Sequence, residues 1–447
     1  ANPASNNTVS VLGMDTTWHT SSNLFIGYYG NGNNVDISDG GTANAYNVFL
    51  GYNSGSSGNS VTLSDSGSLI NIARDLSIGF NASGNSMTVS DGASVLDRNC
   101  YIGQSATSYS NSVSLSGTGS SWINTRDLSV GFSGANNSLS VSSGATVSAA
   151  SFYIGQSSGA NGNHATFSGS GSKLSITNNV YVGALGSNNT MSILSNGAVN
   201  CNSGFVGNGS AADTALGASN RVFVSDAISS WTISEALYVG NYGSGNKLDV
   251  SDGGRVSAKN LYVGYGQTGD AVSGSNNSVV IAGTNSILTA TAGLYVGYYG
   301  SGNSLTASNN ALIQAKGAFG ISTAAGSADN HLRLSAGYFA WAGNHVADLT
   351  VMLEAGKIQY WGYQDGDSGS WVTASPETVR LQYFSLSQAA LAKSFTGGLY
   401  NLGGYTIMYA IPEPSAFAFS GGLGAFAIAL LRRRKAAHNE ISKRKPE

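Results

Sequence analysis

The sequence repeats itself about every 26 residues over most of its length. An asparagine precedes a short run of alternating apolar and polar residues in each copy, and successive asparagines are 26 residues apart except for two spacings of 31. Each copy ends in an apolar triplet followed by glycine, as in residues 76–79. The twelve asparagines are Asn7, Asn33, Asn59, Asn85, Asn111, Asn137, Asn163, Asn189, Asn220, Asn246, Asn277 and Asn303. Such a repeat is typical of a stacked architecture in which each copy contacts only its neighbours.

The strands predicted within each copy define how the copies stack. Three short runs alternate with period two between clusters of Gly, Ser, Asn and Asp, which is the pattern of β-strands. The glycines after the triplets alternate in spacing between 24 and 28 residues, and a shift of two residues leaves every side chain on its own face. We therefore predict an all-β parallel β-solenoid (β-helix) of about twelve coils over residues 1–325, roughly 55 to 60 Å long. The asparagines are expected to stack inside it as a structural ladder.

Residues 326–410 depart from the repeat and are expected to form a small mixed cap. An exposed end of a solenoid presents unpaired strand edges that invite aggregation, so a covering segment is expected there. The pattern predicts helices at 345–357 and 387–394, and strands at 358–361, 379–383 and 405–409.

Composition excludes several classes of function. Charged residues are 10% of the chain and the net charge is −3, so we expect no nucleic-acid partner. Hydrophobic residues are 41%, which is too many for a disordered chain. The two cysteines, Cys100 and Cys201, lie four coils apart, about 19 Å at the strand spacing. A disulfide requires Cα atoms within roughly 7 Å, so both cysteines are expected to be unpaired.

The C-terminal residues 411–447 have a different pattern. A Pro-Glu-Pro motif is followed by 17 uncharged, mainly apolar residues and then by a basic cluster. The motif residues are Pro412, Glu413 and Pro414, and the basic residues include Arg432, Arg433 and Arg434. An apolar stretch of this length is at the short limit for a membrane span, and the basic residues would keep that end on the cytoplasmic side. We expect a C-terminal transmembrane helix.

This order of motif, apolar stretch and arginine cluster resembles the PEP-CTERM sorting domain. The repeats resemble the β-solenoid repeat shared by PEP-CTERM proteins and type V secretion passengers, and residues 117–131 are the clearest copy. The resemblance implies an exported protein of a Gram-negative bacterium that makes extracellular polysaccharide. It also implies an inner-membrane-anchored precursor, processed by an exosortase, that reaches the cell envelope, surface or extracellular matrix. The start at Ala1 rather than methionine fits a removed signal peptide, or an expression fragment.

One outward column of the predicted third strand is aromatic. Because alternate residues of a strand point to opposite faces, the middle residue of each triplet is expected to point outward. Nine of these eleven positions are aromatic, and the other two are Ser77 and Ser129. The nine are Phe25, Phe49, Tyr101, Tyr153, Tyr181, Phe205, Tyr238, Tyr262 and Tyr295, and Tyr28, Tyr52, Tyr265 and Tyr298 would widen the stripe. Flat rings suit sugar faces or a neighbouring solenoid, whereas the alternative is that they only stabilise the coil.

No catalytic residue, metal site or cofactor is predicted. Residues 155–159 match a GxSxG nucleophile elbow with His164 nearby, but that motif needs a helix after it, and here the next repeat follows. Turn aspartates recur one coil apart, at Asp39, Asp65 and Asp91 and again at Asp226 and Asp252. Calcium would relieve their repulsion, but solvated turn residues are the preferred interpretation.

The sequence therefore predicts a structural or adhesive protein of the cell surface or extracellular matrix rather than an enzyme. Its expected partners are an exosortase-type enzyme, the membrane through the C-terminal helix, and extracellular polysaccharide or like solenoids. The alternative is a polysaccharide-binding protein or a polysaccharide-degrading β-helix enzyme, such as a lyase or glycoside hydrolase. Such enzymes cluster carboxylates on one outward face, whereas this chain offers single acids among Ser, Thr and Asn.

Overall fold

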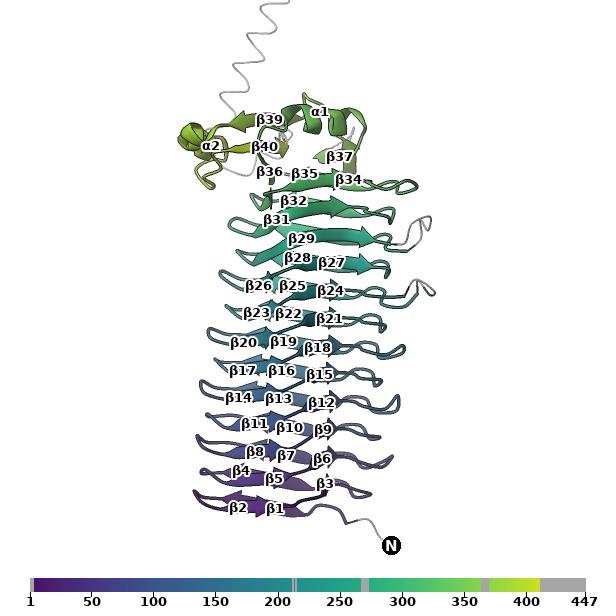
Figure 1. The fold of residues 1–447 in the computed structure, drawn as a ribbon, viewed down its shortest axis with the longest axis vertical. Coiled ribbons are helices and arrows are strands. Elements are labelled where there is room, and N and C mark those ends of the chain that lie inside the picture. Colours follow the sequence, from purple (N-terminus) through teal and green to yellow (C-terminus); the bar gives the residue numbers. More distant parts are fainter. Residues whose placement is uncertain (1–3, 211–212, 214, 267–272, 363–369, 411–447) are drawn as a thin grey trace, which may run out of the picture.

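The structure is a computed structural model that describes residues 4–410, apart from 211, 212, 214, 267–272 and 363–369. These residues form a parallel β-solenoid of about thirteen coils, followed by a small group of helices and strands at its C-terminal end (Figure 1). The predicted fold class is therefore confirmed for the solenoid. The first twelve coils each contribute to a first, a middle and a third column of strands, and the thirteenth contributes to the first and middle columns.

The first column forms its own sheet, in which neighbouring coils pair parallel and in register. Its strands are β1 (Thr8–Leu12), β4 (Asn34–Ser38), β7 (Ser60–Leu63), β10 (Ser86–Val89), β13 (Ser112–Ser116), β16 (Ser138–Ser142), β19 (His164–Ser168), β22 (Thr190–Leu194), β25 (Arg221–Ser225), β28 (Lys247–Ser251), β30 (Ser278–Ala282), β32 (Ser304–Ser308) and β35 (His331–Ser335).

The middle and third columns belong to one second sheet. The middle strands are β2 (Thr17–His19), β5 (Thr42–Ala45), β8 (Leu69–Ile72), β11 (Ser94–Asp97), β14 (Ser121–Asn124), β17 (Thr146–Ala149), β20 (Lys173–Ile176), β23 (Ala198–Cys201), β26 (Ser230–Ile233), β33 (Leu312–Ala315) and β36 (Tyr338–Ala342). The third strands are β3 (Asn23–Ile26), β6 (Asn47–Leu50), β9 (Asp75–Ile78), β12 (Asn99–Ile102), β15 (Asp127–Val130), β18 (Ser151–Ile154), β21 (Asn179–Val182), β24 (Ser203–Val206), β27 (Ala236–Asn241) and β34 (Ala318–Ile321). Two long strands, β29 (Arg255–Tyr265) and β31 (Ile287–Val296), span both columns.

The core is one continuous column of apolar side chains inside the coils. Alternate residues of each strand are buried, as in β13, where Val113 and Leu115 are inside and the serines between them are not. The largest fully buried side chains include those of Trp122, Phe152 and Trp231. Each such side chain contributes about 1.5 to 3 kcal/mol to folding by leaving water, so the stack is stabilised coil by coil.

Eleven of the twelve predicted ladder asparagines, from Asn33 to Asn303, are buried in one interior column, and the exposed Asn7 of the first coil donates to Asn33. Each Oδ1 accepts hydrogen bonds from the backbone N–H and the Nδ2 of the asparagine one coil earlier. Asn111 donates to Asn137 at 2.9 and 3.1 Å, and Asn137 donates to Asn163 at 2.8 and 3.1 Å. The glycine after each triplet is explained by the same column. Gly103 has a φ of 74°, and a Cβ there would collide with the side chain of Asn137.

The predicted end of the solenoid at residue 325 is wrong, because a thirteenth coil follows. Asn303 donates to Oδ1 of Asn330 from its backbone N–H at 2.9 Å and from its Nδ2 at 3.0 Å, and β35 pairs parallel with β32. Asn330 comes 27 residues after Asn303, one more than the repeat. The strand that follows keeps its inward and outward faces, since Leu332 and Leu334 are fully buried.

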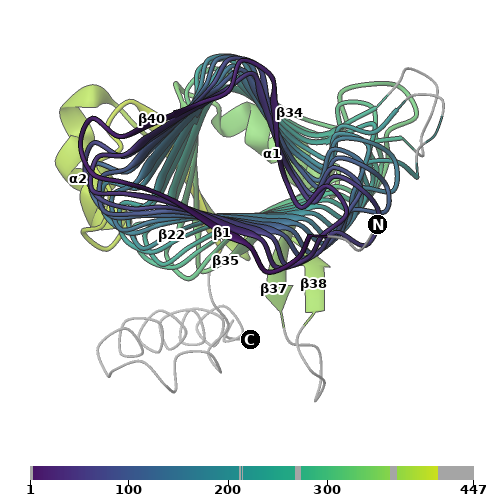
Figure 2. The same ribbon diagram turned by 90° about the horizontal axis from the view of Figure 1, so that it is seen from below.

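The cap covers the last coil with five elements that the sequence predicted and one strand that it did not. They are α1 (Val346–Glu354), β37 (Ile358–Gly362), β38 (Ser370–Thr373), β39 (Val379–Phe384), α2 (Ala389–Phe395), which a short 3-10 turn η1 (Leu386–Gln388) precedes, and β40 (Tyr405–Ala410). Helix α1 lies over the end of the interior (Figure 2), where Leu349 and Leu353 join the core. Strand β37 continues the first sheet beside β35, and β40 pairs antiparallel with β36. The cap therefore protects the strand edges of the last coil.

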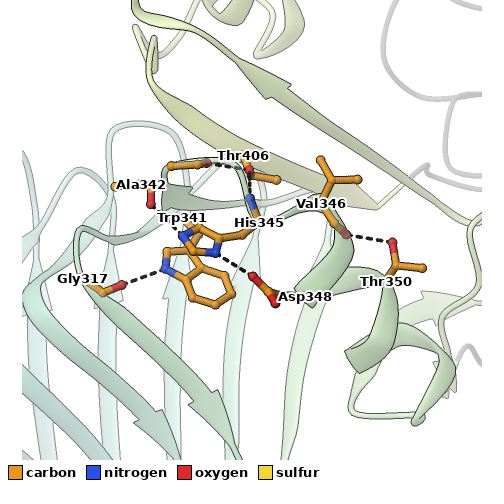
Figure 3. Close-up of polar contacts among 9 residues, drawn as sticks. Gly317, Trp341, Ala342, His345, Val346, Asp348, Thr350 and Thr406 are labelled. Carbon is orange, nitrogen blue, oxygen red and sulfur yellow. Dashed lines mark hydrogen bonds and ion pairs between the residues drawn. The ribbon is translucent and has the colours of Figure 1, made fainter.

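A cluster at the start of the cap fixes α1 to the last coil (Figure 3). The imidazole of His345 stacks on the indole of Trp341, with ring centroids 3.7 Å apart and an interplanar angle of 6°. His345 Nδ1 lies 2.8 Å from Asp348 Oδ2, and its Nε2 lies 3.0 Å from the carbonyl oxygen of Ala342. Trp341 Nε1 donates to the Gly317 carbonyl at 2.7 Å. The ring stacking and these polar contacts join the last coil to the first turn of α1.

The predicted C-terminal anchor lies outside the described residues. Pro412, Glu413, Pro414 and the arginines 432–434 all belong to residues 411–447. In the part of the chain that the structure describes, no helix is long and apolar enough to cross a membrane.

Candidate functional site: an aromatic column on the third strands

The aromatic residues predicted to point outward lie in register along the third column of strands. Phe25 pairs with Phe49, Tyr153 with Tyr181, and Tyr262 with Tyr295 as partners in neighbouring strands. In each strand the residues on either side point inward; Leu237 and Val239, which flank Tyr238, are fully buried. The parallel register of the solenoid therefore places one ring above the next.

Six successive rings form an unbroken stack over coils six to eleven. Neighbouring ring centroids are 4.7 to 5.3 Å apart, and the interplanar angles are 4 to 15°. The six rings are Tyr153, Tyr181, Phe205, Tyr238, Tyr262 and Tyr295. We call this set the aromatic column. Aromatic pairs stabilise a fold by about 0.5 to 1.5 kcal/mol beyond their buried area, so the column contributes to stability.

The remaining three aromatic positions are separated from this stack. Phe25 and Phe49 stack on each other with centroids 5.3 Å apart, and Tyr101 packs edge-on against Phe132. The two serines of the series interrupt the rings: the Ser77 hydroxyl lies 2.7 Å from Oε1 of Gln104 in the next coil, and Ser129 makes the equivalent bond to Gln156 at 2.6 Å. Both serines are fully buried. The band predicted as one stripe is thus divided by Ser77 and Ser129 into the Phe25–Phe49 pair, Tyr101 and the aromatic column.

Stacking decides which part of each ring reaches solvent. Of the nine aromatic residues, only Phe25 is more than about a third exposed, at 37%, and the others are half-buried. Since the faces of the inner rings of the aromatic column cover one another, the parts that reach solvent are ring edges and tyrosine hydroxyls. The expectation that flat faces meet sugar rings therefore needs revision for the middle of the column.

A second row of tyrosines flanks the aromatic column at its C-terminal end. Tyr265 and Tyr298 stack on each other with centroids 5.4 Å apart, and both meet the column edge-on, at 5.3 Å from Tyr262 and 5.4 Å from Tyr295. Tyr28 and Tyr52 flank the N-terminal segment in the same way. The four tyrosines that were predicted to widen the stripe therefore pack edge-on against one side of it.

Three hydroxyls of the aromatic column, those of Tyr153, Tyr238 and Tyr262, are neutral hydrogen-bonding groups. Burial raises the pKa of Tyr262 to about 12, with the neighbouring tyrosines adding to the shift. Burial also raises the pKa of Tyr153 and of Tyr238. These phenols stay protonated at any physiological pH, so each can donate as well as accept a hydrogen bond.

The GxSxG match has no helix after it. Residues 155–159 form the turn after β18, and the Ser157 backbone N–H donates to the Phe132 carbonyl at 2.9 Å. His164 begins β19 on the outward side of the first sheet. The strand-turn-helix geometry that exposes a nucleophilic serine is therefore not formed at this motif.

Three of the five turn aspartates, Asp65, Asp226 and Asp252, accept a hydrogen bond from the preceding coil. Asp39, Asp65, Asp91, Asp226 and Asp252 all have positive φ, from 53 to 78°, which Asp tolerates better than most residues. The carboxylate of Asp226 accepts from the Ser195 backbone N–H at 2.9 Å. Within the described ranges, no group of three or more His, Cys, Asp or Glu residues is arranged to hold a metal ion.

Two polar residues inside the core escaped the sequence analysis. Asp97 and Asn124 are register partners in adjacent coils, and they are 4% and 3% exposed. Asp97 Oδ2 accepts a hydrogen bond from Trp122 Nε1 at 2.9 Å, whereas Asp97 Oδ1 and both side-chain polar atoms of Asn124 have no partner among the described residues. Burial raises the pKa of Asp97 to about 8. Asp97 comes two residues after the inward Val95, and Asn124 comes two residues after the inward Trp122. This alternation is the sequence signal that would have placed both side chains inside.

Both cysteines are free and buried, as predicted. Burial raises the pKa of Cys201 to about 12 and that of Cys100 well above its ordinary value. Neither thiol has thiolate character, so neither is a nucleophile at neutral pH.

Comparisons of this chain with protein-family models, with curated proteins and with solved structures found no match.

Proposed function

We propose that the protein is an exported structural or adhesive rod of the cell surface or extracellular matrix, associated with extracellular polysaccharide. The aromatic column would be its contact surface, either for polysaccharide or for a second solenoid of the same kind. The C-terminal residues 412–434 would hold a precursor in the inner membrane of a Gram-negative bacterium until an exosortase-type enzyme processes it. The observation that carries the proposal is the straight stack of six rings, repeated once per coil.

The geometry of the aromatic column supports an edge-on contact. A ring edge carries partial positive charge while the face is negative, so a row of edges and phenol hydroxyls offers favourable positions for the oxygen atoms of a sugar polymer. The rows repeat at about the 4.8 Å strand spacing. A polymer that lies along the rod would therefore meet many weak contacts at once, and such contacts add through effective concentration.

Replacing Tyr238, Tyr262 and Tyr295 with serine is expected to weaken the binding of the producing cell's purified polysaccharide, or self-association, by at least about tenfold. Binding would be measured by co-sedimentation with the polysaccharide and self-association by sedimentation velocity. The circular-dichroism spectrum should stay β-rich, since Ser77 and Ser129 occupy equivalent positions.

The triple Tyr→Phe variant at the same positions is the matched control, because it keeps the stack and removes only the hydroxyls. Loss of binding in both variants assigns the contact to the hydroxyls, and loss in the serine variant alone assigns it to ring edges. If polysaccharide binding and self-association both survive in a folded serine variant, the aromatic column is only structural and the proposed contact surface is wrong.

A further inference from the structure

A groove of about 430 Å³ lies where the cap folds back against the outer face of the middle strands. Its floor consists of two neighbouring columns of outward residues from β26, β29, β31 and β33. One column contains Arg255, Ile287 and Leu312, and the other contains Thr232, Thr289 and Gln314. The cap segment Tyr400 to Leu402 closes one end. The groove therefore combines residues about 150 positions apart in the sequence and exists only when the cap is in place.

The end wall of the groove is held firmly in place. The Tyr400 hydroxyl donates to the Asn310 carbonyl at 2.7 Å, and its ring packs edge-on against Tyr338 with centroids 5.8 Å apart. Tyr400, Leu402 and Leu312 belong to a separate apolar cluster between the cap and the last coils. This side of the molecule is the one that α2 covers in Figure 2. A ligand would thus meet a wall that is already formed, which reduces the cost of binding.

The chemistry of the groove is uneven from one side to the other. Arg255 is exposed, and it is the one charged residue in the lining, which contains no carboxylate. In the described part of the chain it takes part in no ion pair. Thr289 Oγ1 donates to Gln314 Oε1 at 3.4 Å, and the Asn401 amide stands at the rim. One side therefore offers a guanidinium in the same column as the half-buried Ile287, and the other offers hydroxyls and amides.

We infer that this groove binds a saccharide that carries a carboxylate group, such as a uronic acid residue of an acidic polysaccharide. The planar guanidinium of Arg255 matches a carboxylate with two parallel hydrogen bonds. The hydroxyls and amides of the second column match sugar hydroxyls, and the half-buried Ile287 side chain offers an apolar contact for the C–H face of the sugar. The volume lies within the range of small-ligand sites. Because the lining holds no pair of carboxylates, the groove binds the sugar without hydrolysing it.

This inference deepens the proposed association with polysaccharide, on which it rests, by naming an acidic sugar and a discrete site for it. The groove lies on the middle strands, and the aromatic column lies on the third strands. The serine variant of the aromatic column leaves the groove intact, and an Arg255 variant leaves the column intact. Each proposal can therefore fail without the other.

The test titrates the folded full chain with trigalacturonate and, separately, with the neutral trisaccharide maltotriose, by isothermal titration calorimetry. We expect trigalacturonate to bind and Arg255→Gln to weaken it at least about tenfold, the effect of losing a charge-assisted hydrogen bond. Arg255→Lys should recover only part of the affinity, because an ammonium lacks the planar fork. The control is Arg126→Gln, which removes an exposed arginine from a turn outside the groove.

Three results would overturn the inference. The first is no binding of trigalacturonate by the unmodified chain at millimolar concentration. The second is equal affinity in the Arg255→Gln and Arg126→Gln variants, which would place any binding elsewhere. The third is equal binding of triglutamate, which would make the groove a general site for acidic chains rather than a saccharide site.

Discussion

Replacing Asn137 with alanine is expected to destabilise coils five to seven by about 3 to 5 kcal/mol. Asn137 is fully buried, and its side chain accepts two hydrogen bonds from Asn111 and donates to Asn163 and to the Ser108 carbonyl. Truncation leaves several buried donors and acceptors without partners, and each costs about 1 to 3 kcal/mol. The alanine side chain cannot restore this lost stability, because the polar groups of the neighbouring asparagines remain buried without their partner.

Amide hydrogen exchange of residues 112–182 is the suitable measurement. Stacked coils contact only their neighbours, so one part of the solenoid can open without the rest. Hydrogen exchange suits this case because it reports the free energy of local opening. The control is Asn200→Ala, because Asn200 points outward from β23 and should change the exchange by less than about 0.5 kcal/mol. A similar small change for Asn137→Ala would show that the ladder is not a main source of stability.

Replacing Asp97 with asparagine is expected to stabilise the protein more and more as the pH rises. Burial raises the pKa of Asp97 from 3.8 to about 8, so the folded protein holds this proton over a range in which the unfolded chain has released it. Below about pH 4 the buried carboxyl does not lower the free energy of unfolding of the wild type. As the pH rises from 4 toward 8, that free energy falls progressively. The pKa shift is about four units and each unit corresponds to about 1.4 kcal/mol, so the variant should be more stable by up to roughly 6 kcal/mol at pH 9.

The measurement compares chemical denaturation of the wild type and Asp97→Asn at pH 4, 6 and 9. At pH 4 both proteins carry an uncharged side chain at this position, so the difference there should be close to zero and serves as the internal control. The asparagine can still accept the hydrogen bond from Trp122 Nε1. A stability difference that does not change between pH 4 and pH 9 would mean that Asp97 is not a buried titrating group.

The solenoid was predictable because its two markers have one physical origin. The asparagine needs an interior position with partners in both neighbouring coils, and the glycine of an earlier coil must lack a Cβ to make room for it, as Gly103 does for Asn137. These requirements recur in every coil, so they appear in the sequence as periodic residues. The thirteenth coil was missed because one additional residue before Asn330 breaks the spacing without breaking the ladder.

The candidate sites were only partly predictable. Strand alternation places the outward aromatic residues correctly, but the sequence does not say that rings one coil apart stack face to face and expose their edges. That follows from the in-register pairing, for instance of Tyr238 with Tyr262. The groove at Arg255 could not be predicted, because Tyr400 reaches it only through the tertiary fold of the cap. A local pattern cannot carry information on a contact between such distant segments.

The most direct test of the proposed function is the location of the full chain in the bacterium that encodes it. Antibody labelling of intact cells, with fractionation, should find the protein at the cell surface or in the extracellular matrix, together with the polysaccharide. The variant in which Arg432, Arg433 and Arg434 are replaced by alanine should fail to hold its precursor in the inner membrane. A wild-type protein that remains in the cytoplasmic fraction and is never labelled on intact cells would contradict the account.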